Sequence, residues 1–434
     1  MKKMMIVPSV IAMATIAYGG FWDALNKVQR TVDTVNAIDH AVNGRPATQP
    51  VQPAQPVVQQ PAQSTTQQTA QTTPASSTVS AAQSQPAQVS APTVDSAALA
   101  AFAAQRTTAT DTAVPELKWG NLYVKKPATP EQVQEAKKAY LEKKDSLAGA
   151  TIRFENVDDA TVAATLAVFH EASNVDVSKS KLTTLAPFGL LIDAQKLSLN
   201  KVECKDTKPL ASLVKVRTLS LRYCTISDFS GLAGLQSLED LDLYGASVTG
   251  TLAPLATCPK LKKVDFYAMK GPQEVYDSLG TLAQVKNFEG GLTKMTSIKW
   301  LCSVPQAESL HVFAEKIDDL TPISTLVNLT YFRGWNMIGD SMSTALGDLS
   351  FLAPCRKLKK LELPGSSYSN IGLIGSFTEL ETLDLSNAKQ PVDVSFVKNL
   401  PKLKRLNLRG TQVVNGSAIP AGVKVDSDKK TTGL

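Results

Sequence analysis

The chain has 434 residues, 43% of them hydrophobic, and a formal net charge of +6 from 45 Lys and Arg against 39 Asp and Glu. Charges of both signs alternate, and no basic cluster carries the interleaved aromatic residues typical of nucleic-acid binding, so we expect no nucleic-acid partner. With three histidines and no phosphate-binding loop, G-x-S-x-G or H-E-x-x-H motif, the sequence argues against a metal site, a cofactor and an enzyme.

Residues 1–20 have the order of a secretory signal. Two lysines precede an apolar run over residues 4–18, and two glycines follow it. An uncleaved membrane anchor is the alternative, but Pro8 interrupts the run, which is too short to span a bilayer. We therefore expect an exported protein that is periplasmic, displayed on the cell surface or secreted.

Residues 21–43 predict a short amphipathic helix. Its apolar residues recur at alternating steps of four and three, with charged residues between them. These apolar positions are Phe21, Leu25, Val28, Val32 and Val35. Such a seam indicates self-association or contact with an envelope surface. The alternative is a marginal helix left beside the cleavage site.

Residues 44–115 predict a disordered linker. They consist almost entirely of Pro, Gln, Ala, Thr, Ser and Val, which offer too little apolar surface to offset chain entropy. A coil of this kind would span roughly 45 to 50 Å root-mean-square. The linker would therefore act as a tether between the amphipathic segment and the rest of the chain.

Residues 116–175 predict a helical N-terminal cap and degenerate repeats. The segment T-P-E-Q at 129–132 is a capping box with proline at the first helical position, which predicts a helix over about 130–144. A second helix over about 160–172 is expected to follow an aspartate cap. Because the terminal units of a solenoid need covering, both helices indicate architecture rather than function.

Residues 176–425 repeat one apolar phrase, L-x-x-L-x-L. Successive central positions such as Leu219, Leu241 and Val264 are 22 or 23 residues apart. One unit of this kind cannot bury its own leucines, so the units must stack into a continuous core. The sequence therefore predicts an α/β solenoid, a leucine-rich-repeat array with a parallel β-sheet on its concave face. A disordered tail is expected at 426–434.

One repeat carries a family resemblance. From Leu219 to Leu235 the chain reads L-S-L-R-Y-C-T-I-S-D-F-S-G-L-A-G-L. This resembles the short repeats of bacterial internalin-like leucine-rich-repeat proteins, and the resemblance implies their solenoid fold. The usual asparagine is replaced by Cys224, Ala246 or Thr411. Because one scaffold carries many unrelated binding roles, the resemblance does not extend to the family's role in cell invasion.

The five cysteines are interpreted mainly as structural. Cys204, Cys224, Cys258 and Cys355 fall at interior positions of the repeat, which predicts small buried hydrophobic residues. A bridge between Cys204 and Cys224 on neighbouring units remains open. Cys302 does not fit this pattern.

The residues that flank the paired leucines of each strand are expected to project from the concave face. The column after the second leucine is rich in aromatic residues, and the column between the leucines is rich in charged ones. The predicted ligand-binding residues are Tyr244, Tyr267, Phe313, Tyr331, Trp335, Asp242, Asp265, Glu289, His311 and Arg333. An insertion of about seven residues follows Trp335 and is expected to frame this face.

These columns predict recognition of a protein or glycan ligand, because aromatic side chains supply rigid contact area and charges set orientation. A structural envelope tether with a passive array is the first alternative. A glycan-active enzyme, with Asp242 and Asp265 as a carboxylate pair, is a weaker one.

Overall fold

The computed structural model describes residues 96–434, apart from residue 181 and residues 203–204, 292–293, 314–316, 318 and 336–346. The expected signal, the expected amphipathic helix and most of the expected linker lie outside the described residues, as does Cys204.

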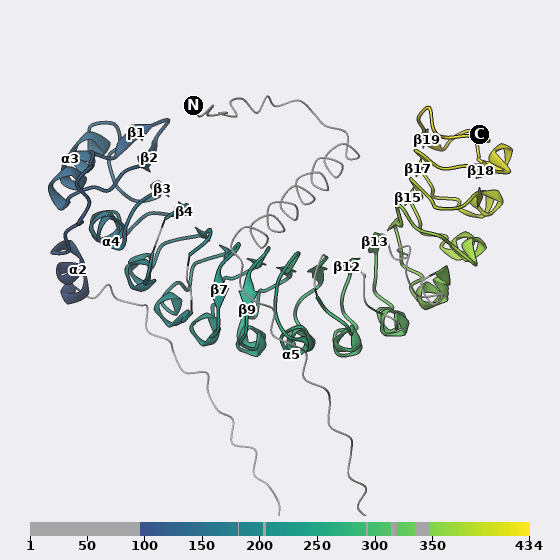
Figure 1. The fold of residues 1–434 in the computed structure, drawn as a ribbon, viewed down its shortest axis with the longest axis horizontal. Coiled ribbons are helices and arrows are strands. Elements are labelled where there is room, and N and C mark those ends of the chain that lie inside the picture. The colour runs from purple at the N-terminus through teal and green to yellow at the C-terminus, as the bar shows by residue number, and fades with distance from the viewer. Residues whose placement is uncertain are drawn as a thin grey trace, which may run out of the picture. The chain divides into compact units, whose positions relative to one another are not determined.

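One sheet of 15 strands forms the inner side of a curved array (Figure 1). Neighbouring strands are parallel, except that β1 and β2 form an antiparallel pair. In spatial order the strands are β1 (Glu116–Lys118), β2 (Asn121–Val124), β3 (Thr151–Glu155), β4 (Asn174–Ser178), β5 (Lys196–Leu199), β6 (Thr218–Ser220), β8 (Asp240–Asp242), β10 (Lys263–Asp265), β11 (Asn287–Glu289), β12 (Ser309–Phe313), β13 (Tyr331–Trp335), β14 (Lys360–Glu362), β15 (Thr382–Asp384), β17 (Arg405–Asn407) and β19 (Lys424–Asp426). The predicted leucine-rich-repeat solenoid is confirmed.

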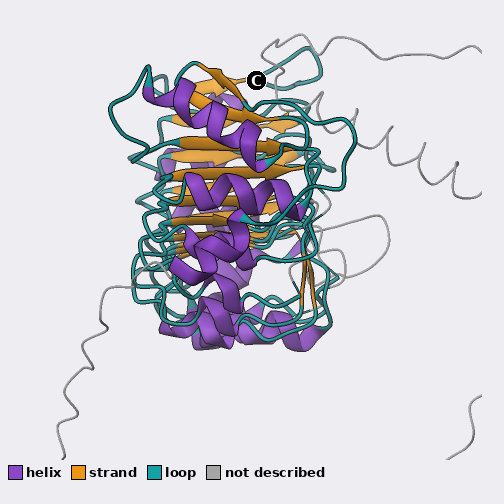
Figure 2. Cartoon of the chain, turned by 90° about the vertical axis from the view of Figure 1, so that its left-hand side faces the viewer, coloured by secondary structure: helices purple, strands orange, loops and turns teal. Residues whose placement is uncertain are grey.

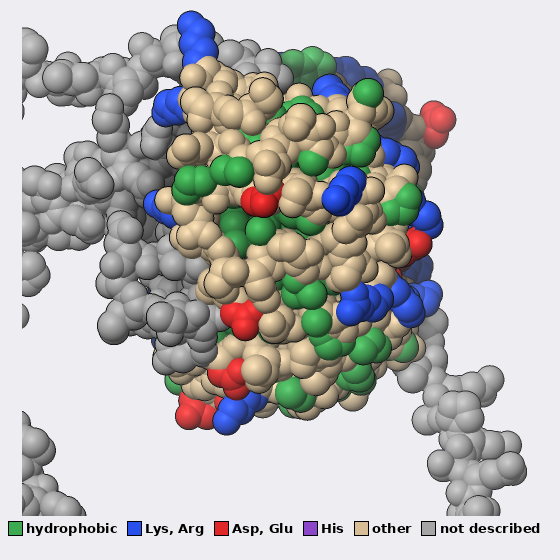
Figure 3. All heavy atoms as spheres, turned by 90° about the vertical axis from the view of Figure 1, so that its right-hand side faces the viewer, with side chains coloured by type: hydrophobic (Ala, Val, Ile, Leu, Met, Phe, Trp, Pro, Cys, Tyr) green, Lys and Arg blue, Asp and Glu red, His purple; other side chains and the backbone are tan. Residues whose placement is uncertain are grey.

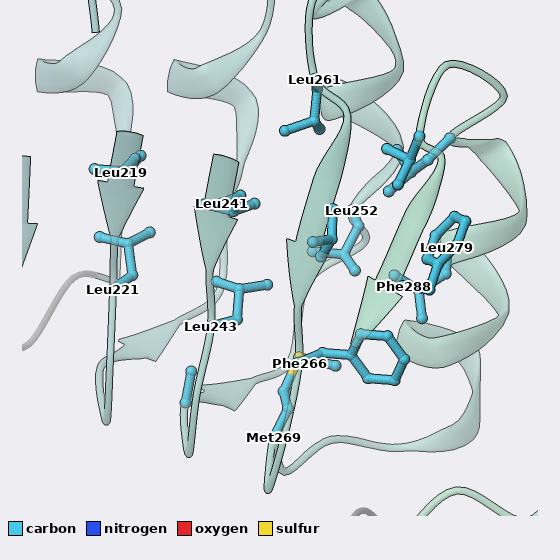
Figure 4. Close-up of a cluster of buried hydrophobic side chains, with 14 of the residues drawn as sticks. Leu219, Leu221, Leu241, Leu243, Leu252, Leu261, Phe266, Met269, Leu279 and Phe288 are labelled. Atoms are coloured by element: carbon cyan, nitrogen blue, oxygen red, sulfur yellow. The ribbon is translucent and has the colours of Figure 1, made fainter. Parts of the chain in front are cut away.

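Register within the sheet follows the leucine period. Leu219 is the partner of Leu241, which is the partner of Val264, and all three are at most 1% exposed. Figure 4 shows Leu219, Leu241 and neighbouring apolar side chains directed into the same interior. Because each unit buries its leucines only against the units beside it, stability accumulates from one interface to the next.

Short helices line the outer side of the array (Figure 1). Asp228, Asp319 and Asp393 each accept a hydrogen bond from the backbone N–H two residues on, at 2.7–2.9 Å. These carboxylates satisfy N–H groups that the helix starts leave unpaired. The helices are η1 (Ala186–Leu190), η2 (Lys208–Leu210), η3 (Ser230–Leu232), η4 (Ala253–Thr257), α5 (Gln273–Asp277), η5 (Ser278–Thr281), η6 (Lys299–Ser303), η7 (Thr321–Thr325), η9 (Leu349–Leu352), η10 (Ile371–Ser376), η11 (Ser395–Asn399) and η12 (Gly416–Ala418).

Two small parallel sheets lie beyond the turns that follow the long sheet. One pairs β7 (Thr225–Ile226) with β9 (Ser247–Val248), and the other pairs β16 (Val392–Asp393) with β18 (Val413–Val414). They continue the contact between neighbouring units past the turns.

The two cap helices are where the sequence places them. α3 (Pro130–Leu141) begins at Thr129 with a complete capping box, and α4 (Asp159–Val168) begins at Asp158, which accepts from the N–H of Thr161. Both cover the N-terminal end of the sheet, which Figure 2 views directly. They shield the apolar interior of the first units from water.

The ordered part extends beyond the expected boundaries at both ends. Within the segment expected as linker, Ser96–Ala103 forms α2, and Arg106 pairs with Glu131 at 2.5 Å. Within the expected tail, the N–H of Val413 donates to the carbonyl of Thr432 at 2.7 Å. Each terminal segment completes the hydrogen bonds of an end unit, which composition alone does not reveal.

The C-terminal end leaves some apolar surface exposed. Figure 3 views this end and shows apolar side chains among polar atoms. Val414 and Leu434 are exposed. Among the residues described, no helix is both long and apolar enough to cross a membrane.

The buried cysteines behave as core residues. Cys224, Cys258 and Cys355 are fully buried, whereas Cys302 is exposed. Burial raises the pKa of Cys258 and raises that of Cys355 to about 11, so neither thiol ionises readily. The bridge between Cys204 and Cys224 stays a hypothesis because Cys204 lies outside the described residues.

An aromatic cluster replaces leucines in the middle of the array. Gly290 stands where most units have the second leucine, and the ring of Phe266 from the preceding unit occupies the vacated space. Trp300 lies 6.2 Å from Phe266 and 5.1 Å from Phe288 between ring centroids. Figure 4 shows Phe266 projecting toward the strand that carries Phe288.

A left-handed residue recurs in the turn after the sheet. Its φ is positive in nine units, although only three of the nine residues are glycine. These residues are Asn156, Lys179, Lys201, Tyr223, Gly245, Ala268, Gly365, Asn387 and Gly410. Because a Cβ crowds the backbone in this conformation, the residues other than glycine are strained. Among them, the asparagines are strained least.

Replacing Ala268 with glycine should therefore raise the free energy of unfolding by about 1 kcal/mol, because it removes left-handed strain at φ 54°. The matched control is Ala233→Gly, since Ala233 has a φ of −61° and the same change there only loosens the unfolded chain. Urea titration measures both. A loss of stability in both variants would contradict the strain argument.

Candidate ligand-binding face

The column between the leucines is continuous along the sheet. Asp242 is the register partner of Asp265, Asp265 of Glu289, Glu289 of His311, and His311 of Arg333. The structure therefore brings these five predicted residues together on successive strands, about 4.8 Å apart. Because the leucines on either side of them point into the core, these side chains project from the sheet's other face.

Three tyrosines form a ladder beside this column. Tyr244 and Tyr267 stack with ring centroids 5.4 Å apart and an interplanar angle of 11°. Tyr223 meets Tyr244 edge-on at 5.4 Å and is half exposed. We call Tyr223, Tyr244 and Tyr267 the tyrosine ladder.

Tyr223 is not among the predicted residues because it lies one position beyond the aromatic column, in the left-handed turn. Gly245, the equivalent residue of the next unit, is the sequence feature that could have indicated the packing of Tyr223. A Cβ at Gly245 would meet the ring of Tyr223 at 2.6 Å, so glycine is what allows Tyr223 to pack there. The pair Tyr223 and Gly245 could therefore have been recognised as coupled.

Ionic contacts fix the start of the ladder. Arg222 Nε donates to Asp242 Oδ2 at 2.5 Å, and the Arg222 guanidinium lies 5.4 Å from the Tyr244 centroid. Asp242 Oδ1 also accepts the Tyr244 N–H at 3.0 Å. Asp242 thus holds both the turn and the arginine beside the ladder.

Asp265 carries a less compensated charge. Its Oδ1 accepts the N–H of Tyr267 at 3.0 Å, and no cation within the described ranges pairs with it. Burial raises the pKa of Asp265, and the negative charges of Asp242 and Glu289 raise it further. Glu289 is paired with Lys263 at 2.9 Å. A cation approaching the ladder would therefore relieve repulsion at Asp265.

A second polar group surrounds Glu362. The Tyr331 hydroxyl donates to Glu362 Oε2 at 2.8 Å, Lys360 Nζ lies 2.8 Å from Oε1, and Arg333 Nε lies 3.5 Å from Oε2. Burial alone raises the pKa of Glu362, but hydrogen bonds from Lys360 and Tyr331 bring it below its usual value. Tyr331 stands in the column before the first leucine, so it is separate from the tyrosine ladder.

His311 lies between the two groups. Its ring centroid is 6.1 Å from that of Tyr267, and its neighbour in register is Arg333. Its Nε2 is buried and makes no hydrogen bond with the residues that the structure describes. Burial and the positive charge of Arg333 lower the pKa of His311 to about 4, so the ring is neutral at pH 7.

This lowered pKa predicts a pH dependence of stability. Between pH 6.5 and 4 the unfolded chain binds a proton at His311 that the folded chain does not, so stability is lost as the pH falls through this window. Replacing His311 with glutamine should remove about 2 kcal/mol of that loss. Urea titrations of both proteins at pH 7.5 and 4.5 measure it. Equal pH dependence in both would contradict the burial of a neutral imidazole.

Two predicted residues are placed only by their backbones. Phe313 and Trp335 are register partners in β12 and β13, as the aromatic column requires, but their side chains are not described. The insertion after Trp335 also lies outside the described residues.

A hollow of about 390 Å³ lies at the opposite edge of the sheet, where strands begin. Its polar groups already satisfy one another, because Lys286 pairs with Glu308 at 2.6 Å and Lys357 donates to Asn328 at 2.7 Å. Across the described part of the chain, no group of three or more His, Cys, Asp or Glu is arranged to hold a metal ion. The concave columns remain the stronger candidate site.

The period, the sheet and the outward columns define a leucine-rich-repeat solenoid. Comparison of the sequence with protein-family models and with curated proteins finds no match.

Similar solved structures include bacterial repeat proteins and the ectodomain of a plant receptor kinase from Arabidopsis thaliana. They include an internalin of Listeria monocytogenes, at 19% identity, covering 71% of this chain and 89% of that chain with a TM-score of 0.48. A leucine-rich-repeat protein of Leptospira interrogans is 16% identical over 64% of this chain and 76% of that chain, with a TM-score of 0.46. A functional domain of InlJ from Listeria monocytogenes, described as including a cysteine ladder, is 16% identical. The match covers 61% of this chain and 69% of that chain, with a TM-score of 0.34. At these identities the likeness concerns the fold alone.

Proposed function

We propose that the protein is an exported binding protein whose concave face recognises a protein ligand. The tyrosine ladder is the observation that carries this proposal. Three adjacent units each present a tyrosine on or beside the outward column, where folding of the repeat demands none. Rigid aromatic side chains with polar ends are the residues on which binding energy usually concentrates.

The packing of the rings favours a protein over a glycan. A sugar bound by tyrosine lies flat against an open ring face. One face of the Tyr244 ring stacks on Tyr267. The ring also contacts Tyr223 and Arg222, so its faces are occupied. The ladder therefore offers ring edges and hydroxyl groups, which suit the peptide groups and side chains of a protein segment.

The charges around the ladder favour a basic ligand. Asp242 and Glu289 have cationic partners within the face, but among the described residues Asp240 and Asp265 make no ion pair. A lysine or arginine of the ligand would meet Asp265 beside the Tyr267 ring. That contact combines ionic attraction with a cation–π interaction.

The two other functions have less support. As a glycosidase pair, Asp242 and Asp265 would need free carboxylate oxygens. Oδ1 of each instead accepts a hydrogen bond from a backbone N–H, and Oδ2 of Asp242 accepts one from Arg222. A passive tether would have no use for a tyrosine ladder on its concave face.

Export and tethering belong to the same proposal. They rest on the signal-like residues 1–20, the apolar seam in 21–43 and the linker composition from residue 44. We therefore propose that the linker joins the array, as a binding module, to an envelope surface or to a second copy of the chain.

The ligand class is tested by binding of the purified protein to a glass slide printed with extended peptides of graded charge and with glycans. We expect the purified protein to bind a subset of basic peptides and no glycan, and Asp265→Asn to weaken this binding by about fivefold. Binding to glycans alone would overturn the proposed class. Binding to neither would favour the passive tether.

A further inference from the structure

The hairpin that begins the sheet has an unusual turn. β1 and β2 pair in antiparallel register from Glu116 with Tyr123 to Lys118 with Asn121, which leaves Trp119 and Gly120 as the two turn residues. Both have positive φ, 50° and 75°. Turns of this kind favour Asn-Gly, because a bulky side chain in the left-handed region is strained.

Trp119 is costly for folding in a second way. It is 80% exposed, the largest exposed fraction among the exposed large hydrophobic residues of the described chain. Its ring meets Tyr123 edge-on at 6.4 Å but buries little area against the rest of the protein. This tryptophan strains the turn and adds nothing to the core, so its placement calls for a role outside folding.

Cations surround this turn. Lys118 Nζ lies 4.4 Å from the Trp119 ring centroid, and Lys125 Nζ and Arg153 Cζ lie 5.6 and 5.9 Å from the Tyr123 centroid. Lys144 Cε lies 3.9 Å from the place that a Cβ on Gly120 would take. All four cations are exposed. Glu116 lies 3.8 Å from Lys125, and Asp176 is the register partner of Arg153.

We propose that this hairpin tip docks on a negatively charged lipid surface. Tryptophan prefers the boundary between lipid headgroups and acyl chains, and each nearby lysine adds attraction to anionic headgroups. The tip is a turn at the end of the array rather than a hollow (Figure 1), and such a projection enters a soft interface without needing a pre-shaped pocket. An acidic protein segment would match the charge but would leave the tryptophan without a partner.

The test is co-sedimentation of the full chain with vesicles of phosphatidylcholine that contain 30% phosphatidylglycerol or none. Trp119→Asn keeps the turn, because asparagine tolerates the left-handed conformation, and should weaken binding to the anionic vesicles roughly tenfold. Lys118→Ser with Lys144→Ser should weaken it by at least about tenfold. The matched control is Val414→Asn, which removes an exposed apolar residue at the other end of the array and should bind like the parent.

Because the parent and the Trp119→Asn protein share residues 1–95, any binding by that segment is common to both. Equal vesicle binding by these two proteins would overturn the proposal, as would parent binding that is absent or independent of phosphatidylglycerol. Capture of soluble polyglutamate that depends on Trp119, without vesicle binding, would instead assign the tip to an acidic protein. None of these results depends on a ligand of the concave face, so the proposed function stands or falls separately.

Discussion

Replacing Gly290 with alanine is expected to lower the free energy of unfolding by about 3 kcal/mol. An added Cβ would overlap three atoms of the Phe266 ring, the farthest of them only 2.8 Å away. Phe266 is 1% exposed and is enclosed by Trp300, so its ring has no room to turn aside. The loss is measured by urea titration followed by circular dichroism.

A double-mutant cycle tests whether this cost comes from the Phe266 ring. Phe266→Leu restores the residue that most units carry and should recover at least about 1.5 kcal/mol in the Gly290→Ala background. The matched control is Gly372→Ala, because a Cβ there meets nothing within 4 Å and stability should stay within about 0.5 kcal/mol. Additive effects of the two substitutions would show that ring and glycine are not coupled.

Replacing Tyr267 with alanine is expected to weaken binding of the selected basic peptide about 30-fold, or about 2 kcal/mol. The substitution removes two ring contacts, because Tyr267 stacks on Tyr244 and also faces His311. Isothermal titration calorimetry measures the affinity. The midpoint temperature of thermal unfolding should fall only slightly, because a stacked aromatic pair contributes about 1 kcal/mol beyond its buried area.

Tyr267→Phe separates the roles of ring and hydroxyl. Burial raises the pKa of Tyr267 to about 12, so its hydroxyl keeps its proton and stays a hydrogen-bond donor at pH 7. If the ladder offers its hydroxyl ends to the ligand, the phenylalanine variant should lose about fivefold in affinity while its ring stays stacked. Unchanged affinity in both variants would place the ligand elsewhere.

The sheet and its register could be predicted because they depend on a period. Steps of 22 or 23 residues between Leu219, Leu241 and Val264 place these residues side by side, and the charged column then follows from alternation along each strand. The capping box of Thr129 and Gln132 likewise predicts the start of α3, because both of its partners lie within one helical turn.

The side-chain partnerships could not be predicted from the period. Asp242 and Asp265 looked like exposed recognition charges, yet both also hold the turn after their strand. Tyr331 was predicted as a further ligand-binding aromatic residue, but its hydroxyl donates to Glu362. All three contacts depend on side-chain rotamers, and the contact of Tyr331 joins residues 31 positions apart, which a pattern of residue types does not encode.

The ordered ends escaped prediction for a related reason. The alanine-rich sequence of α2 is close in composition to the linker before it, and only its contacts with the cap distinguish it. The residues after Asp426 have no repeat phrase, yet Gln412 and Thr432 pair across the last unit. Tertiary contacts rather than local propensity order both segments.

The central claim is that the tyrosine ladder contacts a protein ligand, and site-specific photo-crosslinking tests it most directly. The photoreactive amino acid p-benzoylphenylalanine is placed at position 244 in one protein and at position 327, an exposed valine outside the concave columns, in another. On irradiation with the selected peptide, position 244 should crosslink and position 327 should not. Crosslinking from position 327 alone, or equally from both positions, would contradict recognition by the concave face.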